Sequence, residues 1–179
     1  MIFGKDIFLR LMEEKDIPLK VNWVNDEEIR ETLISDFISE SGTKAWFKKV
    51  IADNSRKEFF ICLRDNNIPI GFTSLKNIDL TNSKAELSML IGEKQFWGKG
   101  YAKEARRLIV SYGFSKIGLN KIYTYNWVEN FKIIGLNKKL GFKVDGVLRK
   151  EIFFNGAFRD MAVMSVLKDE WMQNESNKI

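Results

Sequence analysis

The chain has 179 residues, of which 45% are hydrophobic and 30% are charged, and it carries a formal net charge of +5 at pH 7. This length predicts a single domain over residues 1–179, and the modest positive charge suits a small anionic ligand without requiring nucleic acid. The absence of histidine excludes Ser-His-Asp and Cys-His catalysis and also histidine-based zinc sites.

The one cysteine, Cys62, cannot form an internal disulfide and stands in an apolar run, which predicts a buried core residue. No apolar run approaches the length of a membrane-spanning helix, and the N-terminus lacks the pattern of a signal peptide. We therefore expect a cytoplasmic protein with no membrane partner. With no histidine and a single cysteine, we also expect no metal site.

Hydrophobic periodicity in residues 7–91 predicts alternating strands and helices. Ile29, Leu33 and Phe37 share the spacing of one apolar helix face, so the first helix either continues past Glu31 or is followed by another. In chain order we expect a strand at 7–12, a helix at 15–31 and a break at 41–43. Thr43 should then cap a helix that has Trp46, Phe47, Val50 and Ile51 on one side. Strands should follow at 58–63, 68–76 and 85–91, with a turn at 65–67 between the first two.

The elements expected in the second half of the chain complete the pattern from which we predict the fold class. We expect a helix at 102–114, a strand at 121–127, a helix at 130–139 ended by Gly141, and strands at 142–154 and 157–167 that form a hairpin around Asn155-Gly156. The polar tail 172–179 should be frayed, which leaves a core of about 7–171. The fold class is α+β, with a mixed, mostly antiparallel sheet interrupted by one strand–helix–strand crossover from Ala85 to Trp127.

The most informative motif is Trp97-Gly98-Lys99-Gly100-Tyr101-Ala102, between a predicted strand and a predicted helix. Glycines at such a junction let the backbone approach a ligand, and the helix behind them adds unpaired N–H groups and a positive dipole end. The motif therefore predicts a diphosphate cradle. Taken alone, it is equally consistent with a turn that simply needs glycine.

A second motif starts at Glu129-Asn130 and ends at Gly141-Phe142. The order of strand, glycine-rich turn, helix, strand, Asn-led helix and Gly-Phe resembles the GNAT superfamily of acetyl-CoA-dependent N-acetyltransferases over about 7–171. Trp97 stands where the family pattern has Gln or Arg, as it usually does in the ribosomal-protein N-terminal acetyltransferase branch. Spermidine acetyltransferases and the acetyltransferases of amino sugars look similar over the same span, so the branch stays open.

The resemblance implies a GNAT-like sheet that is splayed at the coenzyme site and flanked by helices, with acetyl-CoA as co-substrate and no metal. It places the diphosphate on the amides of residues 98–103, with Lys99, Lys103 and Arg106 able to reach the diphosphate or the adenosine 3′-phosphate. The implied coenzyme contacts are Leu90, Ile91, Gly92, Trp97, Gly98, Lys99, Gly100, Tyr101, Ala102, Lys103, Asn130 and Asn137.

The resemblance also implies direct attack of an amine on the thioester in a ternary complex. A free N–H of Ile91 would polarise the thioester carbonyl, and Glu86 on the same strand is the expected base. The alternative for Glu86 is an exposed charge at a strand end. Many family members carry a proton-donating tyrosine where this chain has Asn137, so the general acid stays open among Tyr101, Tyr123, Tyr125 and water.

The implied reaction is acetyl transfer to a primary amine of a protein N-terminus, a polyamine or an amino sugar, by a monomer or homodimer that does not bind nucleic acid. The alternative is a non-catalytic acyl-CoA-binding sensor or scaffold, which the missing tyrosine would suit. A third hypothesis, a nucleic-acid-binding domain, is supported only by the sequence pI of about 9.2. Side chains that could attract or line an acceptor are Asp26, Glu27, Glu28, Asp36 and Glu40, and the aromatic Trp23, Phe37, Trp46, Phe153 and Phe154.

Overall fold

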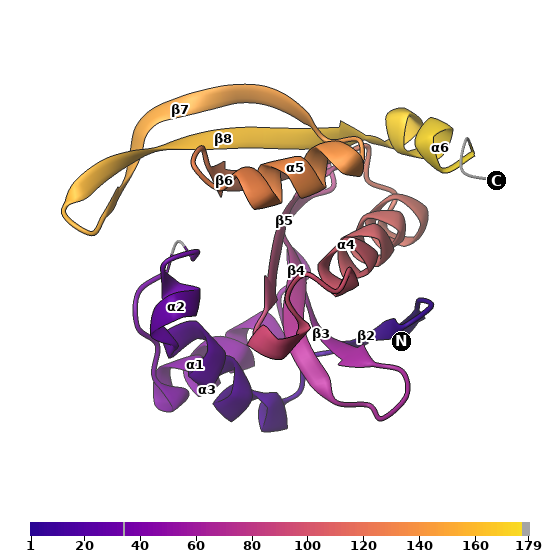
Figure 1. The fold of residues 1–179 in the computed structure, drawn as a ribbon. Helices are drawn as coiled ribbons and strands as arrows, with labels where there is room; N and C mark the ends of the chain where they lie inside the picture. Colours follow the sequence, from indigo (N-terminus) through magenta and orange to yellow (C-terminus); the bar gives the residue numbers. More distant parts are fainter. Residues whose placement is uncertain (34, 177–179) are drawn as a thin grey trace.

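The computed structural model describes residues 1–33 and 35–176 of the chain. These residues form one eight-stranded sheet in the order β1-β2-β3-β4-β5-β6-β8-β7 (Figure 1), in which every neighbouring pair is antiparallel except β5 and β6. This confirms the predicted α+β fold with a mixed, mostly antiparallel sheet. The strands are β1 (Ile2–Phe3), β2 (Ile7–Leu11), β3 (Lys57–Leu63), β4 (Pro69–Asp79), β5 (Lys84–Ile91), β6 (Lys121–Trp127), β7 (Lys143–Phe154) and β8 (Ala157–Leu167).

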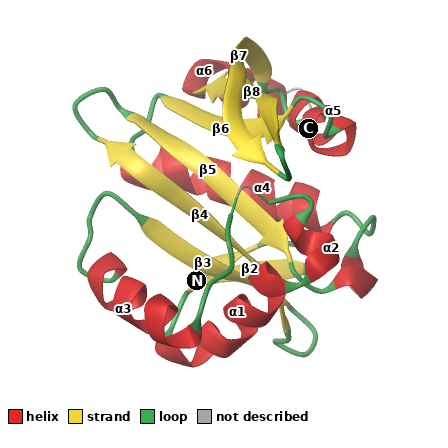
Figure 2. Ribbon diagram, turned by 90° about the vertical axis from the view of Figure 1, so that its left-hand side faces the viewer, coloured by secondary structure: helices red, strands yellow, loops and turns green. Residues whose placement is uncertain are grey.

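Helices cover both faces of this sheet. The helices are α1 (Ile17–Asn25), α2 (Glu27–Arg30), α3 (Glu40–Val50), α4 (Tyr101–Tyr112), α5 (Phe131–Lys139) and α6 (Lys168–Ser176). Helices α1 and α3 lie against one face of strands β3 to β5, and α4 lies against the other (Figures 1 and 2). Two hydrophobic clusters follow from this arrangement. The larger one contains Ile109 of α4, and the smaller one contains Ile17 and Val21 of α1. Burial of these apolar side chains is the main term that holds the layers together.

The pairing of β5 with β6 is short, and the two strands then separate. Their parallel register covers only residues 84–86 and 121–123. Beyond these residues β5 keeps its partner β4 as far as Ile91, and β6 keeps its partner β8 as far as Trp127. Because each strand follows a different neighbour, the strands diverge (Figure 2), which confirms the predicted splay in the sheet.

The first predicted helix is wrong in its extent. Asp26 adopts an extended conformation with φ −63° and ψ 129°, which ends α1 and starts α2. Its side chain accepts a hydrogen bond from the Ile29 N–H at 3.1 Å, so it acts as an N-cap. Leu33 and Phe37 lie outside any helix, and Phe37 is exposed. The helix-like spacing of Ile29, Leu33 and Phe37 therefore does not reflect one helix, because Ile29 lies in the short helix α2 and the other two lie in an irregular segment.

The predicted break at 41–43 is also wrong, because α3 starts at Glu40. Ser39 is the N-cap, and its hydroxyl accepts from the Gly42 N–H at 3.0 Å. Thr43 lies inside the helix, buried, where its hydroxyl donates to the Ser39 carbonyl at 2.7 Å. Ser and Thr both suit an N-cap, and burial of Thr43 decides between them. Of the predicted apolar face Phe47 is buried, whereas Ile51 is exposed.

The C-terminal tail is helical as far as Ser176, so the prediction of fraying from residue 172 is wrong over this stretch. Helix α6 is held by Trp171, which is buried and whose Nε1 donates to the Ser111 hydroxyl at 3.2 Å. Residues 177–179 lie outside the described part of the chain. The short strand β1 was not predicted, because it pairs only through Ile2 and Phe3.

Several local predictions are confirmed. Gly141 follows α5 with φ +89°, and Asn155 and Gly156 turn the β7–β8 hairpin with φ +49° and +77°. Cys62 is buried in the smaller cluster. None of the helices in residues 1–33 and 35–176 combines the length and apolar character that a membrane span needs.

The Ser39 cap gives a test of the helix boundary. We expect Ser39→Ala to lower the free energy of unfolding by about 1 kcal/mol, because it leaves an N–H of the first turn without its acceptor. Ser41→Ala, two residues into the helix, is the matched control and should leave stability within about 0.5 kcal/mol of wild type. Urea unfolding measures both. A larger loss from Ser41→Ala would contradict the observed boundary.

Candidate functional site

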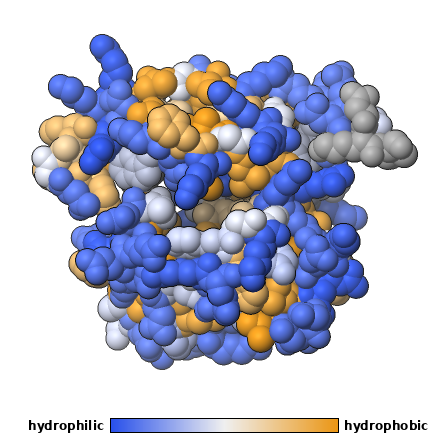
Figure 3. Space-filling model, in the orientation of Figure 1, coloured by the Kyte–Doolittle hydropathy of each residue, from blue (hydrophilic) through white to orange (hydrophobic). Residues whose placement is uncertain are grey.

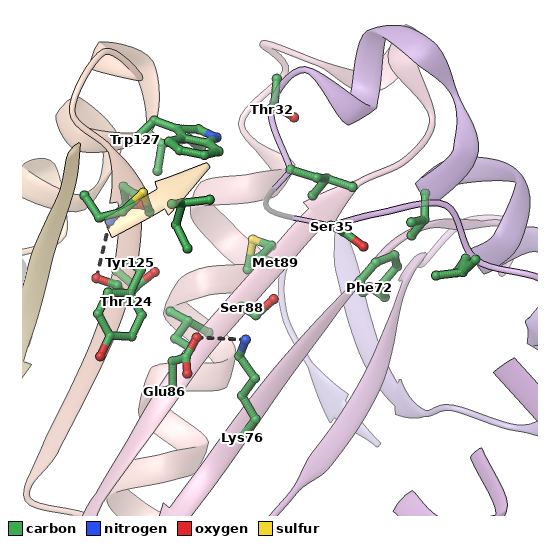
Figure 4. Close-up of a pocket in the computed structure, with 18 of the residues that line it drawn as sticks. Thr32, Ser35, Phe72, Lys76, Glu86, Ser88, Met89, Thr124, Tyr125 and Trp127 are labelled. Carbon is green, nitrogen blue, oxygen red and sulfur yellow. Dashed lines mark hydrogen bonds and ion pairs between the residues drawn. The ribbon is translucent and has the colours of Figure 1, made fainter. Parts of the chain in front are cut away.

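A cavity of about 970 Å³ lies where β5 and β6 separate. On one side the lining comes from α1, α3 and the segment between them, at residues 32, 33, 35 and 37–39. Strands β4, β5 and β6 form the middle, with residues of α5, β7 and β8 beside β6, and Arg106 of α4 lies on the other side. Figure 3 shows the surface hollowed near the middle of this face, and Figure 4 shows side chains of the lining. The cavity therefore reaches from one helical layer to the other through the gap in the sheet.

Glu86 lines this cavity and is only 9% exposed. The antiparallel register puts Lys76 of β4 opposite Glu86, and the Lys76 ammonium lies 2.8 Å from Oε1 (Figure 4). Asn77 donates from Nδ2 to Oε2 at 2.9 Å. Glu86 is thus a buried carboxylate with both oxygens engaged, and the alternative of an exposed charge at a strand end is wrong.

Tyr123 lies beside this carboxylate on the neighbouring strand. The parallel register pairs Glu86 with Tyr123, and both side chains line the cavity. Burial raises the pKa of the Tyr123 hydroxyl, and the negative charge of Glu86 raises it further. Of the other tyrosines considered as acids, Tyr125 also lines the cavity, whereas Tyr101 packs edge-on against Phe96.

The backbone of β5 presents its polar groups to the gap at Ile91. Gly92 donates its N–H to the Ile70 carbonyl at 2.9 Å, so the preceding pair, Gly71 with Ile91, is of the type that makes no mutual hydrogen bonds. The N–H and C=O of Ile91 therefore point away from β4, and the Trp97 indole donates to the Ile91 carbonyl at 2.8 Å. By the same alternation Met89 also faces the gap.

Two predicted neighbours of Ile91 point elsewhere. Leu90 belongs to a pair that exchanges hydrogen bonds with Phe72 of β4, and its side chain is buried in the smaller cluster. Gly92 has its N–H committed to Ile70, and a Cβ at this position would lie 2.1 Å from the Trp23 ring. Neither residue offers a free backbone donor to the gap.

The glycine turn is open to solvent. Gly98 and Gly100 have φ of +75° and +93°, and a Cβ built on either would meet no atom within 4 Å. Within the described residues, the N–H groups of residues 98–102 have no backbone acceptor, whereas the Lys103 N–H donates to the Gly100 carbonyl at 3.0 Å. A row of free donors at the start of α4, a helix of 12 residues, fits an anionic group such as a diphosphate.

The two predicted asparagines behave differently. Asn130 caps α5, accepting from the Ile133 N–H at 3.1 Å, and it lines the cavity. Asn137 is 0% exposed, and its Nδ2 donates to Oδ1 of Asn126 at 3.4 Å. The structure therefore brings Asn130 to the site, whereas it does not bring the Asn137 side chain to any surface.

The three basic residues expected near a phosphate differ in their exposure to solvent. Lys99 and Lys103 are exposed at the start of α4. Arg106 is only 3% exposed and lines the cavity, so it is not part of a solvated helix face, and its contact with a phosphate stays a prediction. Its spacing from Ile109 and Val110 places it at the edge of the buried face of α4, a signal that the sequence contained.

The expected acceptor residues fall into two groups. Phe37 and Trp46 line the cavity, whereas Trp23 is a core residue stacked on Phe60, and Phe153 is exposed on the hairpin. None of the five expected acceptor carboxylates is among the cavity-lining residues, and two of them, Asp26 and Glu28, pair with Lys94. Sequence reasoning missed Lys76, Asn77 and Met89, which reach the site only through strand register.

The described residues contain no group of three or more histidine, cysteine, aspartate or glutamate side chains that could hold a metal ion. The donors present are backbone amides, Lys, Arg and Trp groups, which suit an anionic or oxygen-rich organic ligand.

Comparison with known proteins agrees with the resemblance seen in the sequence. A family model described as an acetyltransferase (GNAT) domain matches residues 6–143. The chain is 28% identical over 170 residues to a spermidine N(1)-acetyltransferase of Vibrio cholerae, covering 94% of this chain and 97% of that protein. It is 29% identical over 178 residues to a putative ribosomal N-acetyltransferase of Bacillus subtilis, covering 94% of each. Two of the three branches named from the motifs are thus represented among the relatives.

A solved structure gives the same result for the fold. The crystal structure of spermidine N-acetyltransferase from Vibrio cholerae in complex with CoA and spermine has a TM-score of 0.90 to this chain. The sequence identity is 27%, and the match covers 94% of this chain and 99% of that one. The similarity therefore extends over the whole sheet and not only over the glycine turn.

The contact between Glu86 and Tyr123 can be tested by titration. We expect Glu86→Gln to lower the pKa of Tyr123, because it removes one of the negative charges that disfavour the tyrosinate. Tyrosine-selective NMR, with Tyr123→Phe to assign the signal, follows this shift. Glu151→Gln removes another carboxylate of the cavity lining and should leave the pKa of Tyr123 in place. Equal shifts in both variants would contradict the observed pairing.

Proposed function

Because the chain belongs to the acetyltransferase (GNAT) family and is an acetyl-CoA-dependent N-acetyltransferase, we propose that both substrates bind at once and that an amine attacks the thioester directly. The observation that carries this proposal is the cavity of about 970 Å³ that spans the gap between β5 and β6. A donor entering from the α4 side and an acceptor entering from the α1–α3 side would meet in this gap. Such a shared site supports transfer without a covalent enzyme intermediate.

In this proposal the donor is held at the start of α4. The free amides of residues 98–102 bind the diphosphate, and the exposed Lys99 and Lys103 add positive charge beside it. The positive φ of Gly98 and Gly100 and the free space at their missing side chains let the diphosphate approach the backbone closely. Asn130 faces the donor from the cap of α5. Trp97 positions this turn through its bond to the Ile91 carbonyl.

We place the thioester against the free edge of β5. The N–H of Ile91 points into the gap, where it can donate to the thioester oxygen as negative charge develops on it. The Met89 N–H lies on the same edge, two residues further from the glycine turn, and offers a second donor to the acyl end of the coenzyme. Both groups are fixed by the pairing of β5 with β4, so they need no reorganisation when the substrate binds.

Glu86 is the base in this mechanism. The acceptor arrives as an ammonium with a pKa near 10 if it resembles lysine, and it must lose a proton before attack. Glu86 lies on the cavity wall, and Lys76 and Asn77 each engage one of its oxygens. A carboxylate oxygen can accept more than one hydrogen bond, so Glu86 keeps the capacity to take a proton. Glu86 lies five residues before Ile91 on β5, roughly 16 Å along an extended strand, so we expect the proton to reach it through ordered water.

The charges of the lining favour a small acceptor with one amine over a polyamine. The cavity is lined by Lys20, Lys76 and Arg106 against Glu86 and Glu151, and Glu86 already pairs with Lys76. Lys20 is likewise paired, with Glu58 behind the lining. A polycation would therefore meet the unpaired cation Arg106 and only one carboxylate, Glu151, that is not already held by a lysine. An amine panel that contains spermidine, an N-terminal peptide and an amino sugar tests this. Spermidine as the best acceptor would overturn it.

The placement of the donor is tested by Gly100→Trp. We expect wild type to bind acetyl-CoA at 1:1 and the variant to lose at least about 10-fold in affinity, because the indole fills the cradle. Gly156→Trp is the matched control, since Gly156 also has positive φ and open space but lies at the hairpin tip. Calorimetry measures all three proteins. Equal losses in both variants would show that strain, and not the cradle, is responsible.

The base is tested by Glu86→Gln, which keeps the shape and removes the proton acceptor. We expect kcat to fall about 100-fold while acetyl-CoA affinity stays within about threefold of wild type. Release of free CoA with a responsive amine is the readout. Glu151→Gln serves as the control for charge in the lining. Unchanged turnover in Glu86→Gln would remove Glu86 from the mechanism.

A further inference from the structure

Arg106 is a buried cation inside the cavity without a counter-charge. Its side chain comes from the buried face of α4 and lines the gap between β5 and β6. Within the described residues, its Nε and Nη1 atoms are buried and have no hydrogen-bond partner. A buried charge that is neither paired nor hydrogen-bonded costs several kcal/mol, so such a group is rare without a function.

Two other basic side chains with little exposure, Arg10 and Lys20, are each paired with a carboxylate. Arg10 lies 2.6 Å from Asp16, and Lys20 lies 3.4 Å from Glu58. Burial lowers the pKa of Arg106 to about 10, and no carboxylate offsets this shift. The guanidinium is still charged at neutral pH, so it keeps its need for an anionic partner.

The cavity offers a further unmatched donor near the gap. Trp127 at the end of β6 lines the cavity, and its Nε1 is buried without an acceptor. Of the two carboxylates in the lining, Glu86 is held by Lys76 and Asn77. The other carboxylate, Glu151, is exposed. Among the described residues of the lining, the buried side chains with unmatched polar atoms are Arg106 and Trp127, and both are donors, so the missing partner is an acceptor that the ligand must bring.

We propose that Arg106 binds a carboxylate at the free end of the donor's acyl group, and that the enzyme transfers short dicarboxylic acyl groups, such as succinyl, in addition to acetyl. This inference rests on the donor site of the proposed function. The carboxylate is assigned to the donor because α4 starts at the glycine turn and covers the face of the sheet opposite α1 and α3. Arg106 lies about 9 Å along the helix axis from Gly100, deeper in the path of the donor.

The transfer itself is unchanged by the longer acyl group. The amine nitrogen forms a bond to the thioester carbonyl carbon, the C–S bond breaks, and the proton lost by the amine is balanced by the proton gained by the CoA thiol. The distal carboxylate keeps its charge throughout. Arg106 acts on this group alone, by a charge-assisted hydrogen bond in a site of low dielectric.

The test compares acetyl-CoA and succinyl-CoA on wild type and Arg106→Met. We expect wild type to use both donors, and the ratio of kcat/KM for succinyl-CoA over acetyl-CoA to fall at least about 30-fold in Arg106→Met. Calorimetry should show the same loss of succinyl-CoA affinity relative to acetyl-CoA. Arg107→Met is the matched control, because Arg107 is the next residue of α4, half-exposed, and pairs with Glu175 on the outside.

Each other outcome is decisive. Turnover of acetyl-CoA with no use of succinyl-CoA by wild type overturns the inference and leaves the proposed function intact. An unchanged donor ratio in Arg106→Met also overturns it. A loss restricted to acceptors that carry a carboxylate, with acetyl-CoA as donor, would assign the Arg106 partner to the acceptor and overturn the donor assignment. No CoA release from either donor would count against the proposed function itself.

Discussion

The one parallel pairing in an otherwise antiparallel sheet is the constraint from which the rest of this site follows. Strand β6 is bound along its whole length by β8, and β5 is bound by β4, so the two can share hydrogen bonds over only residues 84–86 and 121–123. Where they separate, the polar edge of β5 at Met89 and Ile91 loses a partner strand. An unpaired strand edge normally risks aggregation, and here it lies within a cavity.

The crossover between these strands places the remaining parts. It carries the glycine turn at the end of β5 and then α4, so a helix N-terminus with free amides lies at the wide end of the gap. The same helix, one turn and a half further on, buries Arg106 under the gap. In the proposed mechanism, donor binding and acyl selection thus both depend on α4. The base and its partners come instead from the strand register that sets Lys76, Glu86 and Tyr123 side by side.

Much of the fold could be predicted from the sequence, because periodicity and turn residues act locally. The strands at 85–91 and 121–127, the Asn130 cap and the Asn155-Gly156 turn were all read correctly in this way. What failed depended on tertiary contacts. Helix α3 starts at Glu40 with Ser39 as its N-cap, and Thr43 is buried inside it; Trp171, also buried, holds the tail as a helix.

The site shows the same division. Glu86, Ile91 and the glycine turn follow from the motifs, and the structure gives each a defined environment. Lys76, Asn77 and Met89 could not be predicted, because register between β4 and β5 is a long-range property. The burial of Arg106 in the cavity lining was not predicted, although its spacing from Ile109 is compatible with the buried face of α4. Asn137, carried over from the family pattern, proved to be fully buried.

The most direct test of this account is residue-resolved amide hydrogen exchange with and without acetyl-CoA. The account predicts that the coenzyme protects the amides of Met89, Ile91 and residues 98–102, which lack backbone partners in the free protein. The amides of Leu90 and Gly92 are already bonded to β4, so their exchange should change little. Protection confined to other surfaces, or equal protection along the whole of β5, would contradict the claim that the gap between β5 and β6 holds the donor.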